Sequence, residues 1–393
     1  MSAAVMATYD RFKIAFERGD GPWLVATDGR RYLDFGAGVA VTSLGHCHPH
    51  LVQALSDQAQ KFWHCSNLYQ IPSQERLATR LCDASFADAA FFCNSGAEAV
   101  ECGIKLVRKY QHLAGTPERY RIITCTGAFH GRTLATIAAG GSEKYIEGFE
   151  PKVDGFDHAP FGDLAAVAAA IGPETAGILV EPIQGEGGII PALPPFLQGL
   201  RKLCDQHGLV LFFDEVQCGI GRTGRLFAHH WMDVTPDVMA LAKGLGGGFP
   251  VGACLATTEI ARAFSFGNHG STFGGNPLAM AVGNAVFDVI MAYGFLDDVC
   301  RIADLLQRRL VTLSSRFPGV ISEVRGRGLM LGLKCVIPNR LLIERLIEAG
   351  LLTIPAGDNV VRLLPPLIIG EQEVDQACQM LESACAALAD KAA

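Results

Sequence analysis

Two stretches of the sequence decide how the chain folds: Leu209-Val-Leu-Phe-Phe-Asp-Glu-Val-Gln217 and Val238-Met-Ala-Leu-Ala-Lys-Gly244. Each begins with an apolar run of strand length, which is typical of a strand buried on both faces of a parallel sheet. The first run ends in a carboxylate, Asp214, and the second ends in a single amine, Lys243. Because ligands bind beyond the carboxyl ends of such strands, we expect both groups to lie in one crevice.

A carboxylate beside an amine is what pyridoxal 5′-phosphate requires. This cofactor has a ring nitrogen that an acidic partner keeps protonated, and an aldehyde that condenses with a lysine. A solvated Lys243 is the alternative interpretation, because lysines are usually exposed. The apolar residues before Lys243 and the glycine-rich turn after it instead indicate a desolvated amine, which is neutral and nucleophilic.

Composition restricts the class of protein. The chain has 393 residues, 49% hydrophobic and 19% charged, with a net charge of −7, a balance typical of a compact protein of two or more domains. The net negative charge argues against a basic surface that would bind nucleic acid or an anionic membrane. No apolar stretch approaches the roughly 20 residues of a membrane helix, and the N-terminus does not resemble a signal peptide. The 13 cysteines are scattered through apolar segments, which favours buried thiols and a cytoplasmic location.

Apolar runs alternate with helical patterns through the middle of the chain. This alternation predicts an α/β fold with a largely parallel sheet covered by helices on both faces. The predicted strands are residues 89–93, 121–125, 176–180, 209–213, 238–242 and 252–256. The predicted helices are residues 97–110, 163–170 and 195–207.

The sequence after Pro277 changes character. Long helical periodicity runs through residues 278–313, short strand patterns cover residues 329–333 and 360–364, and the tail has one apolar helix face. We interpret this region as a smaller α+β domain completed by the N-terminal segment around residues 23–44. The predicted division is an N-terminal segment of the small domain at 1–55, a large cofactor-binding domain at 56–275 and the C-terminal small domain at 276–393.

Polar residues follow the predicted strands at their carboxyl ends. After strand 89–93, Ser95 and Glu98 form a capping box at a helix start, and Gly96 lets a ligand approach the backbone. Free amides at a helix N-terminus suit a phosphate, although an ordinary cap without a ligand is the common alternative. After strand 121–125, Phe129 offers a ring face for stacking.

Other motifs do not match the cofactors that they suggest. Gly244-Leu-Gly-Gly-Gly248 lacks the ending of a P-loop, and Gly185-Glu-Gly-Gly188 leads into prolines instead of the helix that a dinucleotide site needs. The histidines of His46-Cys-His-Pro-His50 match no standard zinc spacing, so we expect a structural turn and no metal site. His130 could be a ligand or a base, but support of the cofactor pocket is the favoured role.

With these residues considered, the chain resembles the class III, ornithine-type aminotransferases of fold type I, which use pyridoxal phosphate. The resemblance covers nearly the whole chain, and it implies a mostly parallel large domain with a smaller α+β domain. The motifs that carry it are Asn94-Ser-Gly-Ala-Glu-Ala99, Phe129-His-Gly-Arg-Thr133, Glu181-Pro-Ile-Gln-Gly-Glu-Gly-Gly188, Asp214-Glu-Val-Gln217, Ala242-Lys-Gly244 and Ser271-Thr-Phe-Gly-Gly-Asn-Pro277.

The resemblance implies a role for each residue of the cofactor site. Lys243 would bond the cofactor and then carry a proton during the reaction, while Asp214 would keep the ring nitrogen protonated. Phe129 and Val216 would enclose the ring. The remaining implied contacts are Ser95, Gly96 and Ala97 at the phosphate, His130 in the pocket, Gln217 at the phenolic oxygen, and Thr272 from the partner subunit of an obligatory homodimer. Ala97 departs from the pattern, because many relatives have threonine there.

For the substrates, the resemblance implies a switchable ion pair. Glu181 would pair with Arg362 in one half-reaction and release it in the other to bind the α-carboxylate of 2-oxoglutarate. Arg132 would bind the second carboxylate through its planar guanidinium. Val39 stands where ornithine aminotransferases have a tyrosine that holds a free α-amino group, and an apolar residue there favours an N-acylated donor.

The implied reaction is amino transfer from N2-acetylornithine to 2-oxoglutarate, giving N-acetylglutamate 5-semialdehyde and glutamate in arginine biosynthesis. N-succinyl-diaminopimelate, succinylornithine, ornithine and 4-aminobutyrate stay open as alternative donors. A related aminomutase would not need the Glu181 and Arg362 pair, which argues against that reaction. Retention of Lys243 and Asp214 argues against a non-enzymatic binding module.

Overall fold

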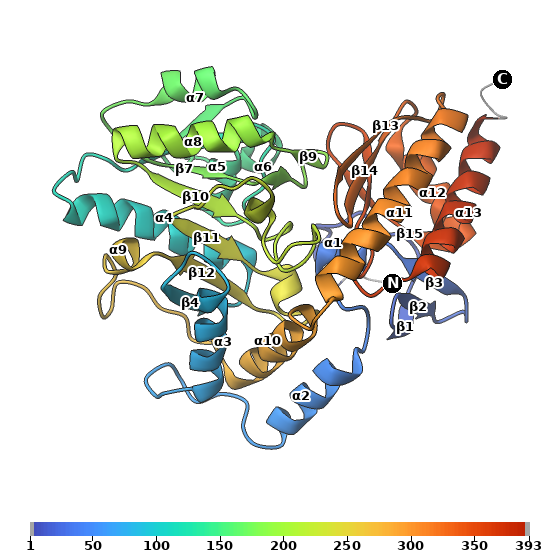
Figure 1. The fold of residues 1–393 in the computed structure, drawn as a ribbon, viewed down its shortest axis with the longest axis horizontal. Coiled ribbons are helices and arrows are strands. Elements are labelled where there is room, and N and C mark those ends of the chain that lie inside the picture. The colour runs from blue at the N-terminus through green and yellow to red at the C-terminus, as the bar shows by residue number, and fades with distance from the viewer. Residues whose placement is uncertain (1–3, 390–393) are drawn as a thin grey trace.

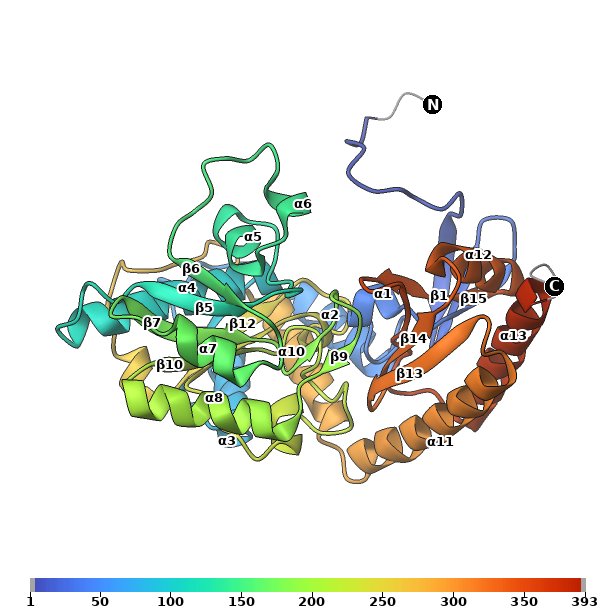
Figure 2. The same cartoon turned by 90° about the horizontal axis from the view of Figure 1, so that it is seen from above.

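The computed structural model describes residues 4–389, and the ends of the predicted terminal segments, residues 1–3 and 390–393, lie outside that range. The described chain forms a seven-stranded sheet with its helices, next to two four-stranded sheets and a two-stranded ribbon (Figure 1). The seven-stranded sheet occupies one side of the molecule, and the two four-stranded sheets occupy the other (Figure 2).

The large sheet has the strand order β4-β12-β11-β10-β7-β5-β6. The strands are β4 (Ala89–Cys93), β5 (Arg121–Cys125), β6 (Phe156–Ala159), β7 (Thr175–Val180), β10 (Val210–Asp214), β11 (Val238–Leu241) and β12 (Gly252–Ala256). β12 is antiparallel to both its neighbours, and the other pairs are parallel. The mostly parallel sheet is therefore confirmed. β6 was not predicted, because Phe-Asp-His-Ala is not an apolar run.

Helices cover both faces of this sheet, which explains why its strands are almost entirely apolar. α4 (Gly96–Leu113) packs on one face, and α7 (Leu164–Ala170) and α8 (Pro194–His207) lie together on the other (Figure 1). Successive side chains of β10 alternate between the two faces: Phe212 joins the cluster under α4, and Phe213 joins the cluster under α8.

The N-terminal strands join the C-terminal part of the chain through backbone pairing. β1 (Phe16–Asp20), β2 (Trp23–Ala26) and β3 (Arg31–Asp34) form a meander, and β15 (Leu351–Leu352) pairs in parallel with β3. The second small sheet contains β13 (Ile321–Arg327), β14 (Met330–Cys335), β16 (Ile354–Ala356) and β17 (Val360–Leu363). This α+β unit has its own helices α11 (Phe295–Arg316), α12 (Asn339–Ala349) and α13 (Glu371–Ala389). The smaller unit built from both ends of the chain is thereby confirmed, while the boundaries at residues 55 and 275 stay a prediction.

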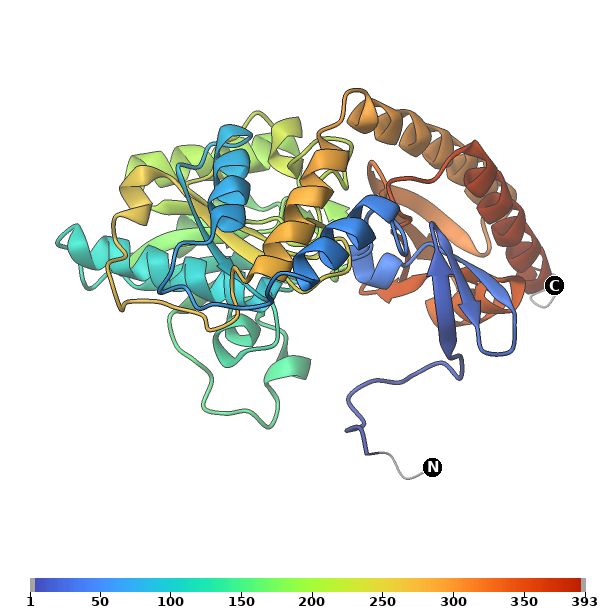
Figure 3. The same ribbon diagram turned by 90° about the horizontal axis from the view of Figure 1, so that it is seen from below.

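The predicted helical periodicity over residues 278–313 is interrupted in the structure. α10 (Pro277–Ile290) ends before Gly294, whose positive φ of 80° begins α11 in a new direction. α10, orange in Figure 3, packs against the blue helices α2 (Pro49–Ala59) and α3 (Pro72–Asp83). Within residues 4–389 no single helix is long and apolar enough to cross a membrane, and only the pair α10–α11, bent by 70°, passes that test together.

The remaining elements are short. They are α1 (Ala37–Ala40), α5 (Leu134–Gly140), α6 (Glu143–Ile146), α9 (Thr258–Ala261), β8 (Ile183–Gln184), β9 (Ile190–Pro191), η1 (Ala228–Trp231) and η2 (Lys243–Leu245). The histidine-rich segment turns at Cys47, and Pro49 and His50 already begin α2. His46 Nε2 lies 2.8 Å from Asp34 Oδ2. Gly45 has a φ of 76°, and a Cβ there would approach the Gly21 carbonyl oxygen to 2.6 Å.

Gly103 provides a test of the packing between α4 and the sheet. A Cβ at this position would lie 2.2 Å from Cζ of Phe212. Although alanine is the better helix former, we expect Gly103→Ala to destabilise the protein by about 1–3 kcal/mol, because the core must shift to admit the methyl group. Thermal unfolding measured at one cofactor concentration checks this. Gly172→Ala is the matched control, since no atom lies within 4 Å of its added Cβ. An equal fall in the unfolding temperature of both variants would contradict the prediction.

Candidate active site

The carboxyl ends of the parallel strands border a cavity of about 420 Å³. Asp214 is the last residue of β10, and Lys243 follows β11 at the start of η2. The cavity is lined by all the predicted site residues except Val39, Thr272 and Arg362. The structure thus brings the cofactor residues of the sequence analysis into one crevice.

Lys243 is only partly exposed at the cavity wall. Burial lowers the pKa of its ammonium group to about 8, and the positive charge of Arg362 acts in the same direction. The carboxylates of Asp214, Glu181 and Glu186 oppose this shift. A substantial fraction of the Lys243 amine is therefore neutral, and so nucleophilic, slightly above neutral pH.

Asp214 is held by two donors at the end of β10. Its Oδ1 accepts the Val216 amide at 3.0 Å, and its Oδ2 lies 2.8 Å from Nδ1 of His130. Burial alone would lower the pKa of His130, but the hydrogen bond and the charge of Asp214, together with Glu181, raise it. The imidazole and the Val216 amide together hold the Asp214 carboxylate in one orientation. His130 Nε2 is buried and has no hydrogen-bond partner among the described residues.

The start of α4 provides a cradle of backbone amides. Ser95 Oγ accepts the Glu98 amide at 3.2 Å, and the Glu98 carboxylate accepts the Asn94 amide at 2.5 Å. A Cβ at Gly96 would lie 2.7 Å from Cγ1 of Val216, so only glycine permits this approach. The arrangement leaves the N-terminus of an 18-residue helix facing the cavity, where its amides and dipole favour an anion.

The predicted ion pair between Glu181 and Arg362 is not formed in this structure. Glu181 accepts the amides of Phe129 and Gly185 at 3.1 and 3.2 Å, so its carboxylate is occupied by the backbone. Arg362, on β17, instead lies 2.8 Å from Oε2 of Glu186. Both glutamates belong to one short motif, and the spacing alone did not identify the partner.

Glu181 and Arg362 are both buried, but their contacts differ. Burial raises the pKa of Glu181 to about 7, against the charge of His130, which lowers it. The Arg362 guanidinium also donates to the Pro355 carbonyl at 2.8 Å and to Oε1 of Gln217 at 3.3 Å. Because Gln217 lines the cavity, Arg362 reaches the cavity wall although it does not line it.

Arg132 lies at the mouth of the cavity and is exposed. Its guanidinium carbon is 3.8 Å from the centroid of the Tyr145 ring and 5.5 Å from that of Phe129. This stacking holds the guanidinium plane while its N–H groups stay open to an anion. Tyr145 was missed by the sequence analysis, because α6 is a short element without a motif.

Two predicted residues lie away from the cavity. Val39 is half-buried against a small apolar cluster, and Val41 lines the cavity in its place. Thr272 is exposed and borders a separate hollow next to Ser271. Their predicted roles at the substrate and at the phosphate of a partner subunit therefore stay predictions.

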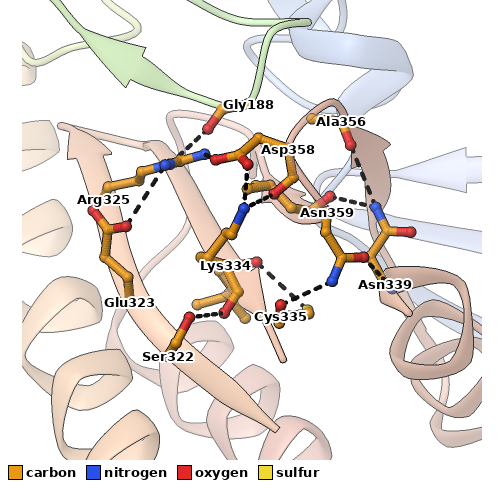
Figure 4. A network of polar contacts seen from close by, with 12 residues as sticks. Gly188, Ser322, Glu323, Arg325, Lys334, Cys335, Asn339, Ala356, Asp358 and Asn359 are labelled. Atoms are coloured by element: carbon orange, nitrogen blue, oxygen red, sulfur yellow. Dashed lines mark hydrogen bonds and ion pairs between the residues drawn. The ribbon is translucent and has the colours of Figure 1, made fainter. Parts of the chain in front are cut away.

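A polar network binds the loop that carries Glu186 to the sheet of β13, β14, β16 and β17 (Figure 4). Arg325 Nε donates to the Gly188 carbonyl at 2.7 Å, and Arg325 Nη2 lies 2.7 Å from Oδ2 of Asp358. Lys334 contacts the same Asp358 carboxylate. The Gly357 amide also donates to the Glu186 carbonyl at 2.8 Å. These contacts place Glu186 opposite Arg362.

The fold and this site define a class of enzyme: the chain belongs to the class-III aminotransferase family, whose family model matches residues 4–385. Among relatives of known name, the acetylornithine aminotransferase of Brucella melitensis is 60% identical and covers 96% of this chain and 94% of its own length. The acetylornithine aminotransferase of Mesorhizobium japonicum is 59% identical, with 99% and 97% of the two chains covered.

Solved structures show the same architecture. The ornithine aminotransferase of Toxoplasma gondii has a TM-score of 0.95 at 30% identity and covers 99% of this chain and 94% of its own. The N-acetylornithine aminotransferase of Stenotrophomonas maltophilia has a TM-score of 0.84 at 40% identity, with 97% of each chain covered. A second structure of the Toxoplasma enzyme reveals partial occupancy of PLP at its active site.

The protein is a pyridoxal-phosphate-dependent aminotransferase, and the residues present match this cofactor. The glycine cradle at α4 matches the phosphate, the His130-supported Asp214 matches the basic ring nitrogen, and the partly neutral Lys243 matches the aldehyde. Phe129 and Val216 line the same cavity and present apolar surface to a ring. Ala97 lacks the hydroxyl of the threonine that many relatives have. The backbone amides at the start of α4 still provide donors for the phosphate.

The lowered pKa of Lys243 predicts the pH dependence of cofactor capture. The cofactor-free protein should bind pyridoxal phosphate covalently at a rate that rises with pH through about 8, as the amine loses its proton, well below the ordinary lysine value of 10.5. Visible absorbance after rapid mixing measures this rate. In Arg362→Ala the midpoint should move to higher pH, because a positive charge has been removed. A wild-type midpoint near 10.5 would contradict the prediction.

Arg325 provides a test of how the Glu186 loop is held. We expect Arg325→Ala to increase amide hydrogen exchange of residues 185–188 by roughly tenfold, since a charged hydrogen bond worth about 1.5 kcal/mol or more is lost. Exchange mass spectrometry of the holoenzyme measures this. Arg309→Ala is the control, because Arg309 pairs with Asp375 on the exposed surface at 2.9 Å. Equal protection in Arg325→Ala and wild type would show that the backbone contacts alone hold the loop.

Proposed function

We propose that this enzyme transfers the terminal amino group of N2-acetylornithine to 2-oxoglutarate, forming N-acetylglutamate 5-semialdehyde and glutamate in arginine biosynthesis. One observation carries the proposal: of two arginines beside the Lys243 cavity, Arg362 is neutralised by Glu186 and Arg132 has no anionic partner among the described residues. The names of the most similar relatives support the choice of donor.

The charges match the two substrates in turn. The donor has a single carboxylate, remote from the reacting amine, and Arg132 at the cavity mouth is placed to bind it through two parallel hydrogen bonds. 2-Oxoglutarate has two carboxylates, so it needs a second cation close to the reacting carbon. Displacement of Glu186 from Arg362 provides that cation without moving the backbone of β17. The Glu186 pair thus replaces the Glu181 pair in our proposal.

The remaining residues handle protons. When bound, the cofactor supplies an electron sink for the carbon next to the transferred nitrogen. Lys243, with a pKa of about 8, is suited to accept and return a proton at that position. His130 holds the Asp214 carboxylate in place, and Glu181, with a pKa of about 7, accepts the Phe129 amide.

An acylated donor is favoured by the apolar wall near α1. Val41 lines the cavity and Val39 packs against a small apolar cluster, so neither of these two side chains offers an oxygen to a free α-amino group. An uncompensated ammonium group would lose its hydration there, whereas an amide loses less. Ornithine and 4-aminobutyrate are the alternatives that the test below separates, and the succinylated donors stay alternatives of the same class.

We also propose a homodimer in which Thr272 of each chain completes the phosphate site of the other. The surface around Thr272 supports this, because it exposes large apolar side chains. These are Phe62, Trp63, Leu68, Tyr69 and Phe273. Asn67 ties the two segments together by donating to the carbonyls of Ser271 and Gly274 at 3.1 and 2.9 Å. The cytoplasmic location expected from the cysteine pattern stays a prediction.

The donor is tested by single-turnover absorbance measurements with N2-acetylornithine, ornithine and 4-aminobutyrate. We expect kcat/KM for N2-acetylornithine to exceed the other two by at least about tenfold, because each of them leaves part of the site without a partner. Glutamate must also react, since it is the product of the second half-reaction. A preference for free ornithine would overturn the proposed donor.

The role of Glu186 is tested by Glu186→Gln. In this variant Arg362 has no carboxylate partner at position 186. The rate of the half-reaction with N2-acetylornithine should therefore fall roughly tenfold, a change of about 1.4 kcal/mol. The glutamate half-reaction should be maintained, so the ratio of the two rates changes. Glu181→Gln is the control, because Glu181 makes no ion pair with Arg362; if it changes the ratio as much as Glu186→Gln does, the assignment is wrong.

A further inference from the structure

Glu215 is a buried carboxylate that the site described above does not use. Its neighbours Asp214, Val216 and Gln217 line the cavity, whereas Glu215 does not. Successive residues at a strand end point to opposite faces, so its side chain leaves β10 on the face away from Asp214. It is only 1% exposed. Because burying a carboxylate is costly unless donors compensate it, this side chain needs partners within the protein.

Three nitrogen atoms of η1 surround the Glu215 carboxylate. Oε2 accepts the Ala228 amide at 2.6 Å, and Oε1 accepts the His229 amide at 2.8 Å. Oε1 also lies 2.7 Å from Nδ1 of His229. Hydrogen bonds to a carboxylate are strong, and the low exposure of both residues shields these from water. One side chain thus binds η1 to the end of β10.

Aromatic side chains fix the His229 end of this contact. The imidazole is stacked on Phe227, with ring centroids 5.7 Å apart and 10° between the planes. The rings of Phe86 and Phe213 lie 6.0 Å from it on other sides. Phe213 directly precedes Asp214 and belongs to the core cluster under α8. The partner of Glu215 is therefore held by the packed core and does not move as a free loop.

The backbone that Glu215 holds carries three of the predicted cofactor contacts. The Glu215 carbonyl accepts the Gly219 amide at 2.9 Å, which closes a turn that contains Val216 and Gln217. Asp214 Oδ1 accepts the Val216 amide at 3.0 Å. The orientation of the Asp214 carboxylate therefore depends on where this turn lies.

We propose that Glu215 is a positioning residue for Asp214, with His229 as its anchor. Glu215 fixes the turn from the face of the sheet opposite the cavity, and the turn keeps the Asp214 carboxylate in the orientation that a basic ring nitrogen requires. The inference concerns the binding of the cofactor, and it holds whichever amine donor the enzyme takes.

A double-mutant cycle on cofactor affinity tests the proposal. The dissociation constant of pyridoxal phosphate is measured by absorbance titration of the cofactor-free protein. Glu215→Gln should weaken binding about tenfold, because the charged contact with His229 is lost, but by less than about twofold when Asp214→Asn is already present. His229→Phe keeps a ring between the phenylalanines and removes Nδ1, so it should show the same pattern with a smaller effect.

A second measurement replaces the ring nitrogen. A pyridoxal phosphate analogue with carbon at that position gives the Asp214 carboxylate no partner. The analogue should therefore bind wild type and Glu215→Gln equally well, although the two proteins differ in their affinity for pyridoxal phosphate. A purely structural role of Glu215 would weaken the binding of both compounds.

Asp237→Asn is the matched control. Asp237 holds the other end of β10, where its Oδ2 accepts the Leu211 amide at 2.7 Å, and it does not line the cavity. This variant should lower the thermal stability of the cofactor-free protein, as Glu215→Gln does, and leave the affinity for pyridoxal phosphate unchanged.

The opposite results overturn the proposal. Equal weakening by Glu215→Gln with and without the Asp214 carboxylate would show that Glu215 acts on stability alone, and so would equal weakening by Asp237→Asn. Unchanged affinity in both Glu215→Gln and His229→Phe would show that Asp214 is positioned without Glu215. If Glu215→Gln does not fold, the same cycle with His229→Phe decides. None of these results affects the proposed choice of substrates, which is tested by turnover.

Discussion

The parallel pairing of β10 with β11 is the constraint on which the site depends. Its register sets Asp214 opposite Ala240, and the Glu215 amide continues the pairing by donating to the Ala240 carbonyl at 3.0 Å. Lys243 therefore emerges three residues beyond the partner of Asp214, at the same edge of the sheet. Helices on both faces bury these strands, so the two charged groups can appear only where the strands end. The start of α4 and the Glu181 motif meet them at that edge.

Burial of several charges in one crevice brings two proton-exchanging groups close to neutrality. Burial of a carboxylate raises the pKa of Glu181 to about 7, and burial of an amine beside Arg362 lowers that of Lys243 to about 8. Asp214 is hydrogen-bonded to His130, and that hydrogen bond and the charge of Asp214 raise the pKa of His130. One desolvated pocket thus contains a carboxylate held by hydrogen bonds and a lysine that can exchange its proton near neutral pH.

Much of the fold and the cofactor site was predictable, because both follow from local patterns. Apolar runs identified the strands that carry Asp214 and Lys243, and a capping motif identified the start of α4. The substrate residues were harder, because they depend on how separate segments dock. Glu181 and Glu186 lie five residues apart in one motif, and only the contacts of the loop with β16 and β17 decide which one meets Arg362. Left-handed backbone at Val39 and Ala40, which no residue pattern announces, accompanies the placement of Val41 in the cavity wall.

The pairing of β3 with β15 has a consequence for the order of assembly. Leu33 pairs with Leu351, so β3 stays without its second neighbour, β15, until more than three hundred further residues have been synthesised. The large sheet is complete by residue 256, and it can form on the ribosome while the N-terminal meander waits. Arg362 is synthesised after the large sheet and after the N-terminal meander. The large sheet with Lys243 and Asp214 is thus synthesised before Arg362, the residue to which the proposed function gives the exchange of substrates.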